Sequence, residues 1–419
     1  MPRSLARHWG LDPEVIQLNH GSYGGTPLAV LEAQSRVRAE MEADLTRYYM
    51  EGLTPALQRS RAALAAFLDA DAEDLVFVVN ASQGAATVFA NVPLGPGDEV
   101  LVSHHEYASC LHQLERDAHV RGFTVTSADV PFPLPPNADE ARADIERAIV
   151  SRVTDRTRLV LLSWITSSSA IVMPIEPIVR AIRARAPECR VLIDAAHAPG
   201  QIPIDMKALE SIGVDYLTGN LHKWVGAPKS SAFVWVRRGL HASGSATPSG
   251  AFEPLTMSSR AGHTPEGLSR LHHLFDYTAT ADFSAWAVVP ETLDTMRAIG
   301  DELDDPSGLK GWGALRAHNN ELCRWGRDLI CNAVDAEPPV PDDLLAHMAV
   351  VVLAPIERDA STINGDPLWA RLRHEHGIQV PVWVQPGVDL RCLRISCQAY
   401  NEICDYERLA AALRDEMAR

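Results

Sequence analysis

The chain has 419 residues, of which 46% are hydrophobic and 22% charged, so it is long enough to bury a large core in about two domains. The formal net charge of -16 makes nucleic acid and anionic membrane surfaces unfavourable partners, because both repel an acidic protein. The sequence has no run of 18 apolar residues and no apolar stretch behind its N-terminal arginines. It therefore predicts neither a membrane-spanning helix nor a secretory signal.

The predicted elements begin with two helices, over residues 26–49 and 55–68. From about residue 74 to residue 239, apolar strand-like runs then alternate with amphipathic helical stretches. The seven runs read DLVFVV, DEVLVS, FTVTSA, RLVLLSWI, RVLID, VDYLT and SAFVWV. Strands that alternate with helices form a mostly parallel sheet covered on both faces, so this region predicts an α/β fold.

The chain after this core predicts a long loop and a second domain. Residues 243–273 are rich in Ser, Gly, Pro and His, and long loops of this kind are often functional. The strands HMAVVVLA, IQVPVWV and LRCLRIS follow, alternating with helices, and predict a smaller domain with a largely antiparallel sheet. We expect an N-terminal segment (1–50) that contributes to the small domain and covers the site, a large domain (51–288) and a small C-terminal domain (289–419).

Polar stretches follow several of the predicted strands. In open α/β sheets, ligands bind at the carboxyl ends of the strands, so these stretches are expected to meet at one edge. Neither GxGxxG nor GxxxxGK[ST] is present, which removes the main sequence support for a dinucleotide site or a P-loop. The stretches are NASQG (80–84), HHEY (104–107), WITSS (164–168), DAAH (194–197) and GNLHK (219–223).

Asp194 and Lys223 are the two residues from which we infer the chemistry. Asp194 ends an apolar strand, where a carboxylate loses water and needs a partner, either a structural one or a buried cation. Lys223 follows the next strand and is flanked by Trp224 and Val225, which favours burial over the usual surface position of lysine. Burial shifts a lysine towards its neutral form, which is a nucleophile that can form a Schiff base.

A lysine Schiff base together with an aspartate at a pyridinium nitrogen is the combination that pyridoxal phosphate (PLP) enzymes use. The aspartate keeps the ring nitrogen protonated, so that the ring can accept electrons from a substrate carbanion. The phosphate needs amide and hydroxyl donors at a helix N-terminus, and the stretch from Asn80 to Gln83 supplies such a place. Tyr107 could stack on the ring.

The order and spacing of eight motifs resemble the fold-type I PLP enzymes of the class V aminotransferase group, and isopenicillin N epimerase-like proteins in particular. The resemblance covers nearly the whole chain and implies a homodimer with shared active sites. The motifs are LNHGSYGGTP (18–27), NASQGA (80–85), HHEYAS (104–109), WITSSS (164–169), DAAHAPG (194–200), GNLHKW (219–224), FDYTATADFSAW (275–286) and IQVPVWV with LRISCQAYN (378–401).

The resemblance implies a role for each matching residue. Lys223 would hold PLP and act as the base at the substrate α-carbon, and Asp194 would pair with the ring nitrogen. Arg394 would clamp the substrate carboxylate, a task that suits a bidentate guanidinium. The other implied residues are Ala81, Ser82, Gln83 and His222 at the phosphate, His197 and Tyr107 at the ring, Ser167 near the ring hydroxyl, Thr280 at the neighbouring subunit's phosphate, and Asn19, His20 and Gly21 over the substrate.

Three reactions are compatible with these residues. We expect an isopenicillin N epimerase-like epimerase or racemase first, with Lys223 removing the α-proton and Tyr107 or a histidine returning one. A C–S lyase and an aminotransferase are the alternatives. The segment PVWVQPGVDL lacks the cysteine that a persulfide mechanism needs, so an elimination is expected to be direct. A non-catalytic protein that kept the fold is disfavoured, because Asp194, Lys223 and Arg394 are all intact.

Cysteine and histidine usage predicts no metal site. The seven cysteines include no CxxC pair, which favours reduced thiols and a cytoplasmic location. Cys392, Cys397 and Cys404 lack zinc-like spacing, and the paired histidines form no HExxH or similar signature.

Overall fold

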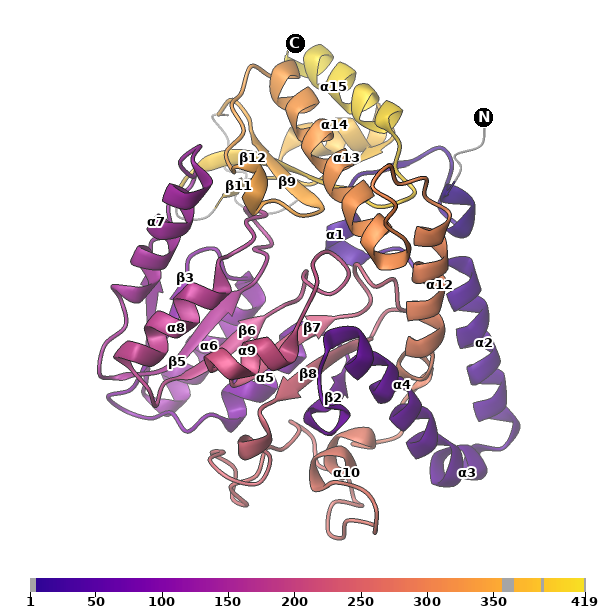
Figure 1. Cartoon of the computed structure of the whole chain (residues 1–419), viewed down its shortest axis with the longest axis vertical. Coiled ribbons are helices and arrows are strands. Elements are labelled where there is room, and N and C mark those ends of the chain that lie inside the picture. Colours follow the sequence, from indigo (N-terminus) through magenta and orange to yellow (C-terminus); the bar gives the residue numbers. More distant parts are fainter. Residues whose placement is uncertain (1–4, 356–364, 386–387, 418–419) are drawn as a thin grey trace.

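A computed structural model describes residues 5–355, 365–385 and 388–417. Its centre is a seven-stranded sheet in the order β2-β8-β7-β6-β5-β3-β4, with a smaller domain packed above it (Figure 1). Only β8 runs antiparallel to its neighbours. The strands are β2 (Leu75–Val78), β3 (Glu99–Ser103), β4 (Thr124–Ala128), β5 (Thr157–Ser163), β6 (Arg190–Asp194), β7 (Tyr216–Asn220) and β8 (Ala232–Val236). The seven predicted strands and the mostly parallel sheet are confirmed.

Both faces of this sheet are buried, as its continuous apolar runs predict. Along β5, for example, Leu159 and Leu161 belong to one apolar cluster, while Val160 and Leu162 belong to the other. The helices that connect the strands of the large domain are α5 (Ala81–Asn91), α6 (Ala108–Arg121), α7 (Ala138–Val150), α8 (Ile175–Arg185) and α9 (Met206–Ile212).

The small domain contains a three-stranded antiparallel sheet in the order β11-β12-β9. The sequence IQVPVWV, predicted as one strand, is divided at Pro381, because proline donates no backbone hydrogen bond to a ladder. The first half pairs in parallel with β1, so the N-terminal segment joins this domain. The elements are β9 (Met348–Val352), β10 (Ile378–Gln379), β11 (Val382–Gln385), β12 (Leu390–Ser396), α12 (Val289–Asp301), α13 (Gly311–Ala333), α14 (Pro367–His374) and α15 (Ile403–Met417).

The N-terminal segment runs along one side of the molecule, where α2 and α4 lie beside α12 (Figure 1). The predicted helix over residues 26–49 is interrupted at Asp44. Its backbone is non-helical, and its side chain caps the next short helix by accepting the Arg47 N–H. The domain boundaries at 50/51 and 288/289 stay a proposal. The elements are β1 (Ile16–Gln17), α1 (His20–Tyr23), α2 (Leu28–Ala43), α3 (Leu45–Arg47), a π-helix (Tyr48–Gly52) and α4 (Leu53–Leu68).

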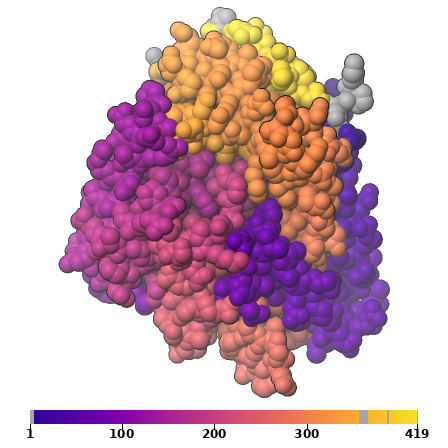
Figure 2. All heavy atoms as spheres, viewed as in Figure 1, coloured from indigo at the N-terminus to yellow at the C-terminus, as the bar shows by residue number. Residues whose placement is uncertain are grey.

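Residues 243–269 form loops that project from the end of the molecule opposite the small domain, and the last residues of the predicted loop (270–273) are helical (Figure 2). Asn91 anchors them, because its side-chain oxygen accepts hydrogen bonds from Ser245 and from the Glu253 backbone. Phe252 is buried there and stacks on Tyr216. Two short helices follow the loops, α10 (Arg270–Asp276) and α11 (Ser284–Ala287). The described part of the chain also contains four 3-10 helices, at Ala6–His8, Ala72–Asp74, Arg238–Leu240 and Asp342–Leu344.

Within the described residues, no helix combines the length and the apolar character that crossing a membrane requires.

Candidate active site

A cavity of about 250 Å³ lies at the carboxyl ends of the parallel strands, where the sequence places its polar stretches. Eight of the cofactor and substrate residues predicted from the sequence line it, and Ser22 and Tyr23 of α1 line it as well. Its lining residues are Ser22, Tyr23, Asn80, Ala81, Ser82, Tyr107, Ser163, Ile165, Ser167, Asp194, Ala196, His197, Asn220, His222 and Lys223.

Lys223 lies three residues after β7 and lines this cavity. Its Nζ is 3.0 Å from Nε2 of His197. Burial, and secondarily the positive charge of Arg394, lowers the pKa of Lys223 to about 8, against the smaller opposing effect of Asp194. The amine is therefore a free base at a much lower pH than an ordinary lysine, and a nucleophile and a general base both need that form.

Asp194 is the last residue of β6 and is 4% exposed. One carboxylate oxygen accepts the backbone N–H of Ala196 at 2.9 Å, and the other lies 3.8 Å from the Cys110 thiol. Among the described residues, no lysine or arginine forms an ion pair with it, and burial raises its pKa. A buried carboxylate without a cationic partner, facing a cavity, fits the protonated ring nitrogen of PLP.

The N-terminus of α5 forms the part of the wall that suits a phosphate. Asn80 caps the helix by accepting the Gln83 N–H at 2.8 Å, and the Ala81 N–H is bonded to Asn220. A Cβ on Gly84 would lie 2.1 Å from the Thr218 hydroxyl oxygen, so this glycine allows the helix to pack closely on β7. Donors at a helix N-terminus suit an anion.

His222 and Gln83 are oriented by the backbone. Nδ1 of His222 bonds the Ser231 carbonyl at 2.9 Å, which leaves Nε2 for a ligand, and burial lowers the pKa of His222 to about 4. The Gln83 side-chain oxygen accepts the Val79 N–H at 2.9 Å. Gln83 does not line the cavity, so its predicted phosphate contact would have to come from its amide nitrogen.

Arg394 lies on β12 of the small domain and is 4% exposed. It is not among the residues that line the cavity, but it contacts two that are, Ser167 and Ser22. One terminal nitrogen donates to the Ser167 carbonyl, and the other lies 3.2 Å from the Ser22 hydroxyl and 3.5 Å from the Asn19 amide oxygen. Its Nε has no partner, and no carboxylate of the described residues pairs with it. Burial lowers its pKa to about 10. A buried guanidinium without an anion suits a substrate carboxylate.

Two aromatic side chains lie at the cavity, Tyr107 and Tyr23. Tyr107 is 45% exposed, and burial of its remaining surface raises its pKa. Tyr23 is 70% exposed, and sequence reasoning did not assign it or its neighbour Ser22. The signal was present, because both belong to the motif LNHGSYGGTP that supplied the three predicted substrate residues.

Asn19, His20 and Gly21 lie beside the cavity, outside its lining. His20 is buried behind Lys223, with Nε2 3.1 Å from the Lys223 carbonyl and Nδ1 2.9 Å from the Tyr400 hydroxyl. A Cβ on Gly21 would lie 2.6 Å from the Met348 sulfur. In this arrangement Asn19 orients Arg394, and the other two residues pack the site from behind.

Thr280 lies outside this cavity and is exposed. Its hydroxyl is 2.9 Å from that of Tyr277, whose ring is covered by Arg260 at 4.1 Å. An exposed threonine is compatible with contact to a second subunit, and that role stays a prediction.

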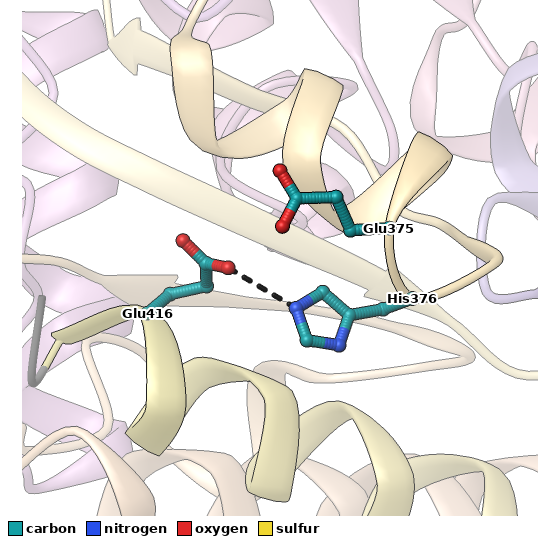
Figure 3. Close-up of side chains that lie close together, drawn as sticks. All are labelled: Glu375, His376 and Glu416. Atoms are coloured by element: carbon teal, nitrogen blue, oxygen red, sulfur yellow. Dashed lines mark hydrogen bonds and ion pairs between the residues drawn. The ribbon is translucent and has the colours of Figure 1, made fainter.

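The described residues contain one group with the proximity of metal ligands, formed by Glu375, His376 and Glu416 in the small domain (Figure 3). His376 Nε2 lies 3.1 Å from a Glu416 oxygen, and Arg371 pairs with the other oxygen. Because Glu416 already has a cationic partner, we interpret the group as an ion-pair cluster that attaches α15 to the segment after α14.

The comparisons with known proteins agree with this geometry. A profile of the family described as "Aminotransferase class-V" matches residues 25–262, more than half of the chain. The chain therefore belongs to the class V aminotransferase family, whose cofactor is PLP. The buried Asp194, the lysine with a lowered pKa and the helix N-terminus all fit that cofactor.

Its curated relatives divide between two activities. Isopenicillin N epimerase of Amycolatopsis lactamdurans is 31% identical, over 97% of this chain and 96% of that protein. A probable chloroplastic L-cysteine desulfhydrase of Arabidopsis thaliana is 29% identical, over 96% and 83%. Among solved structures, the cystine C–S lyase C-DES in complex with cysteine persulfide has a TM-score of 0.74, with 19% identity over 96% of this chain and 98% of that one.

Proposed function

We propose that the protein is a PLP-dependent C–S lyase that eliminates the sulfur substituent of a small cysteine-like amino acid. Arg394 binds the substrate carboxylate, Lys223 removes the α-proton, and Asp194 holds the proton at the ring nitrogen. Bound PLP supplies the electron sink that makes the α-proton acidic. The β C–S bond then breaks with its electron pair going to sulfur. For cysteine, one water is consumed, and sulfide, pyruvate and ammonia are the products.

The observation that carries this proposal is the set of bases in the cavity. Lys223 has a pKa of about 8, whereas burial lowers the pKa of His197 and His222 and leaves them weak bases. The raised pKa of Tyr107 makes it a proton donor rather than a base. One base and one donor suffice for elimination, because the base takes the α-proton and the donor can protonate the leaving sulfur.

The size of the site supports a small substrate. The cavity of about 250 Å³ lies below the range of roughly 300–1,000 Å³ that is typical of small-ligand sites, and it must also accept the cofactor. No cysteine lines it among the described residues, which supports direct elimination over a persulfide on the protein.

Epimerisation is the second candidate function, because the two isopenicillin N epimerases are 31% and 30% identical over nearly the whole chain. It requires Tyr107 or Tyr23 to exchange a proton on the face opposite Lys223. Transamination remains the weakest candidate, because no residue of the cavity demands it.

The deciding experiment incubates the purified holoenzyme with a panel of L-amino acids and small peptides in deuterated water. Chirality, α-deuterium, keto acid and sulfide are measured together. Pyruvate and sulfide from cysteine-like substrates are expected. Deuterated product of both hands without keto acid would replace the lyase by an epimerase.

The attachment of the cofactor has its own test. Borohydride reduction of the holoenzyme should fix PLP covalently on the peptide that contains Lys223, and Lys223→Ala should abolish this adduct. An equal adduct on another lysine in that variant would disprove the assignment.

We further propose a homodimer with shared active sites, located in the cytoplasm. The exposure of Thr280 supports the first part. Mixing the inactive variants Lys223→Ala and Thr280→Ala and refolding them together should restore part of the activity, since a hybrid dimer would contain one intact site. No recovery, or a monomer by light scattering, would contradict shared sites.

A further inference from the structure

His197 has a hydrogen-bond partner at each ring nitrogen. On one side, Nε2 lies 3.0 Å from Nζ of Lys223. On the other, the indole N–H of Trp224 donates to Nδ1 at 3.3 Å. His197 is 2% exposed, so no water competes with these two partners for the ring.

The two contacts determine where the imidazole proton lies. A tryptophan indole nitrogen is a donor only, so Nδ1 must be the acceptor and carries no hydrogen. A neutral imidazole has one N–H, which is then at Nε2 and points at the Lys223 amine. An N–H that faces a nitrogen at this distance needs a lone pair, which lysine has only in its neutral form.

We infer that the indole of Trp224 fixes His197 as the Nε2–H tautomer, and that this tautomer holds the Lys223 amine in its neutral, nucleophilic form. Trp224 is thus a positioning residue that acts on Lys223 through His197. The inference rests on the proposed role of Lys223 as the cofactor lysine, but it is independent of the reaction that follows.

The surroundings make this arrangement rigid. Trp224 is 1% exposed, and its ring packs against His20 and His347 at centroid distances of 4.9 and 5.4 Å. The Gln201 side chain donates to the His197 carbonyl at 2.8 Å. Neither ring can therefore turn without loss of buried contacts.

The charges around His197 keep it neutral. Burial lowers its pKa well below the ordinary value, and Lys223, Arg394, His20 and His222 lower it further. Lys223 itself faces Arg394, which favours the neutral amine, and Asp194, which opposes it. The tautomer of His197 favours the neutral Lys223 amine, as burial and Arg394 do, and it opposes the effect of Asp194 on the pKa of Lys223.

The test measures the protonation of Lys223 without any catalytic assay. The full chain, freed of cofactor, is labelled with acetic anhydride over a range of pH, and acetylation of the Lys223 peptide is quantified by mass spectrometry. Trp224→Phe keeps most of the packing but removes the indole N–H. His197 can then turn a lone pair towards the protonated amine of Lys223. The pH at which acetylation of Lys223 is half-maximal should therefore rise by about one unit, and labelling at any pH below that midpoint should fall about tenfold.

Two controls separate the tautomer from packing. Trp235→Phe removes another indole that is 1% exposed and should leave the midpoint unchanged. In a His197→Leu background, Trp224→Phe should cause no further shift, because no tautomer remains to be fixed. Three results would each overturn the inference. They are an unchanged midpoint in Trp224→Phe, the same shift in Trp235→Phe, and a Trp224→Phe shift that is equal in the wild-type and His197→Leu backgrounds.

A measurement on the unmutated full chain, again freed of cofactor so that the Lys223 amine is free, covers the case in which Trp224→Phe does not fold. Nitrogen-15 NMR of histidine-labelled protein, with His197 assigned by its loss in His197→Leu, distinguishes the two tautomers. A proton on Nε2 is expected, and a proton on Nδ1 would refute the inference. Loss of lyase activity alone would not bear on it, which keeps the inference distinguishable from the proposed function.

Discussion

Single side chains at this site have pKa values shifted from their ordinary ones, and burial is the main cause in each case. Desolvation disfavours every charge, so it lowers the pKa of Lys223 and Arg394 and raises that of Asp194. The Arg394 guanidinium and the Asp194 carboxylate form no ion pair with each other. A substrate carboxylate and the protonated ring nitrogen of the cofactor would supply their missing partners.

The lowered pKa of Lys223 predicts the pH dependence of cofactor attachment. The neutral amine is the reactive form, so attachment should be slow below pH 8 and should rise through about pH 8 to a plateau. Stopped-flow mixing of cofactor-free protein with PLP measures this directly. A midpoint near the ordinary lysine value of about 10.4 would show that burial does not act on this amine.

Replacing Arg394 should separate substrate binding from cofactor binding. Its side chain bonds to Ser167, Ser22 and Asn19, and no residue assigned to the phosphate is among its partners. Arg394→Ala should weaken substrate binding by about 10²-fold or more, since a charge-assisted bidentate contact is lost. The affinity for PLP should change little. Loss of PLP from the purified variant would contradict the carboxylate role.

At the scale of elements, the carboxyl edge of the sheet could be predicted from the sequence, and the way the N-terminal segment joins it could not. The alternation of apolar runs and helices placed Asp194 and Lys223 on one edge, and both line the cavity. Periodicity carries no information on how His20 packs behind Lys223, because that contact spans 203 residues of sequence. The motif at residues 18–27 identified the segment that lies at the site, but only the structure shows that Ser22 and Tyr23 line the cavity.

Gly24 links the N-terminal segment to the site. Its φ of 71° lies in the left-handed region, and a Cβ there would lie 2.0 Å from the His222 carbonyl oxygen and 2.8 Å from Cα of Lys223. Gly24→Ala should therefore push α1 away from Lys223 and abolish most activity. With its ψ of 149°, this backbone conformation is one that glycine adopts and alanine avoids, at a cost of about 1–3 kcal/mol.

Gly97→Ala is the matched control for that variant. Gly97 has a φ of 93° but no atom within 4 Å of the added Cβ, so it shares the backbone strain without the clash. The unfolding temperature should fall in both variants, and further in Gly24→Ala because of the clash, while activity and cofactor affinity should fall only in Gly24→Ala. Equal activity losses would assign the effect to backbone strain.

At the scale of the whole molecule, buried ion pairs tie together segments that are distant in sequence. Arg61 on α4 pairs with Asp276 on α10, and their side chains are 2% and 6% exposed. The same arginine donates to the Leu75 carbonyl of β2 at 3.0 Å. The pair thus joins the N-terminal helices to the motif at residues 275–286, which contains both Asp276 and Thr280.

Removing one partner of this pair should cost far more than removing both. Arg61→Met leaves a buried carboxylate without a cation and should lower the free energy of unfolding by about 3–5 kcal/mol. Adding Asp276→Leu should recover a large part of that loss, because the double variant contains no unpaired charge. Chemical denaturation of the two single variants and the double variant measures the coupling. Additive losses would show that Arg61 and Asp276 do not stabilise each other, and the N-terminal helices would then be held to the large domain by their other contacts, such as the Arg38–Asp282 ion pair.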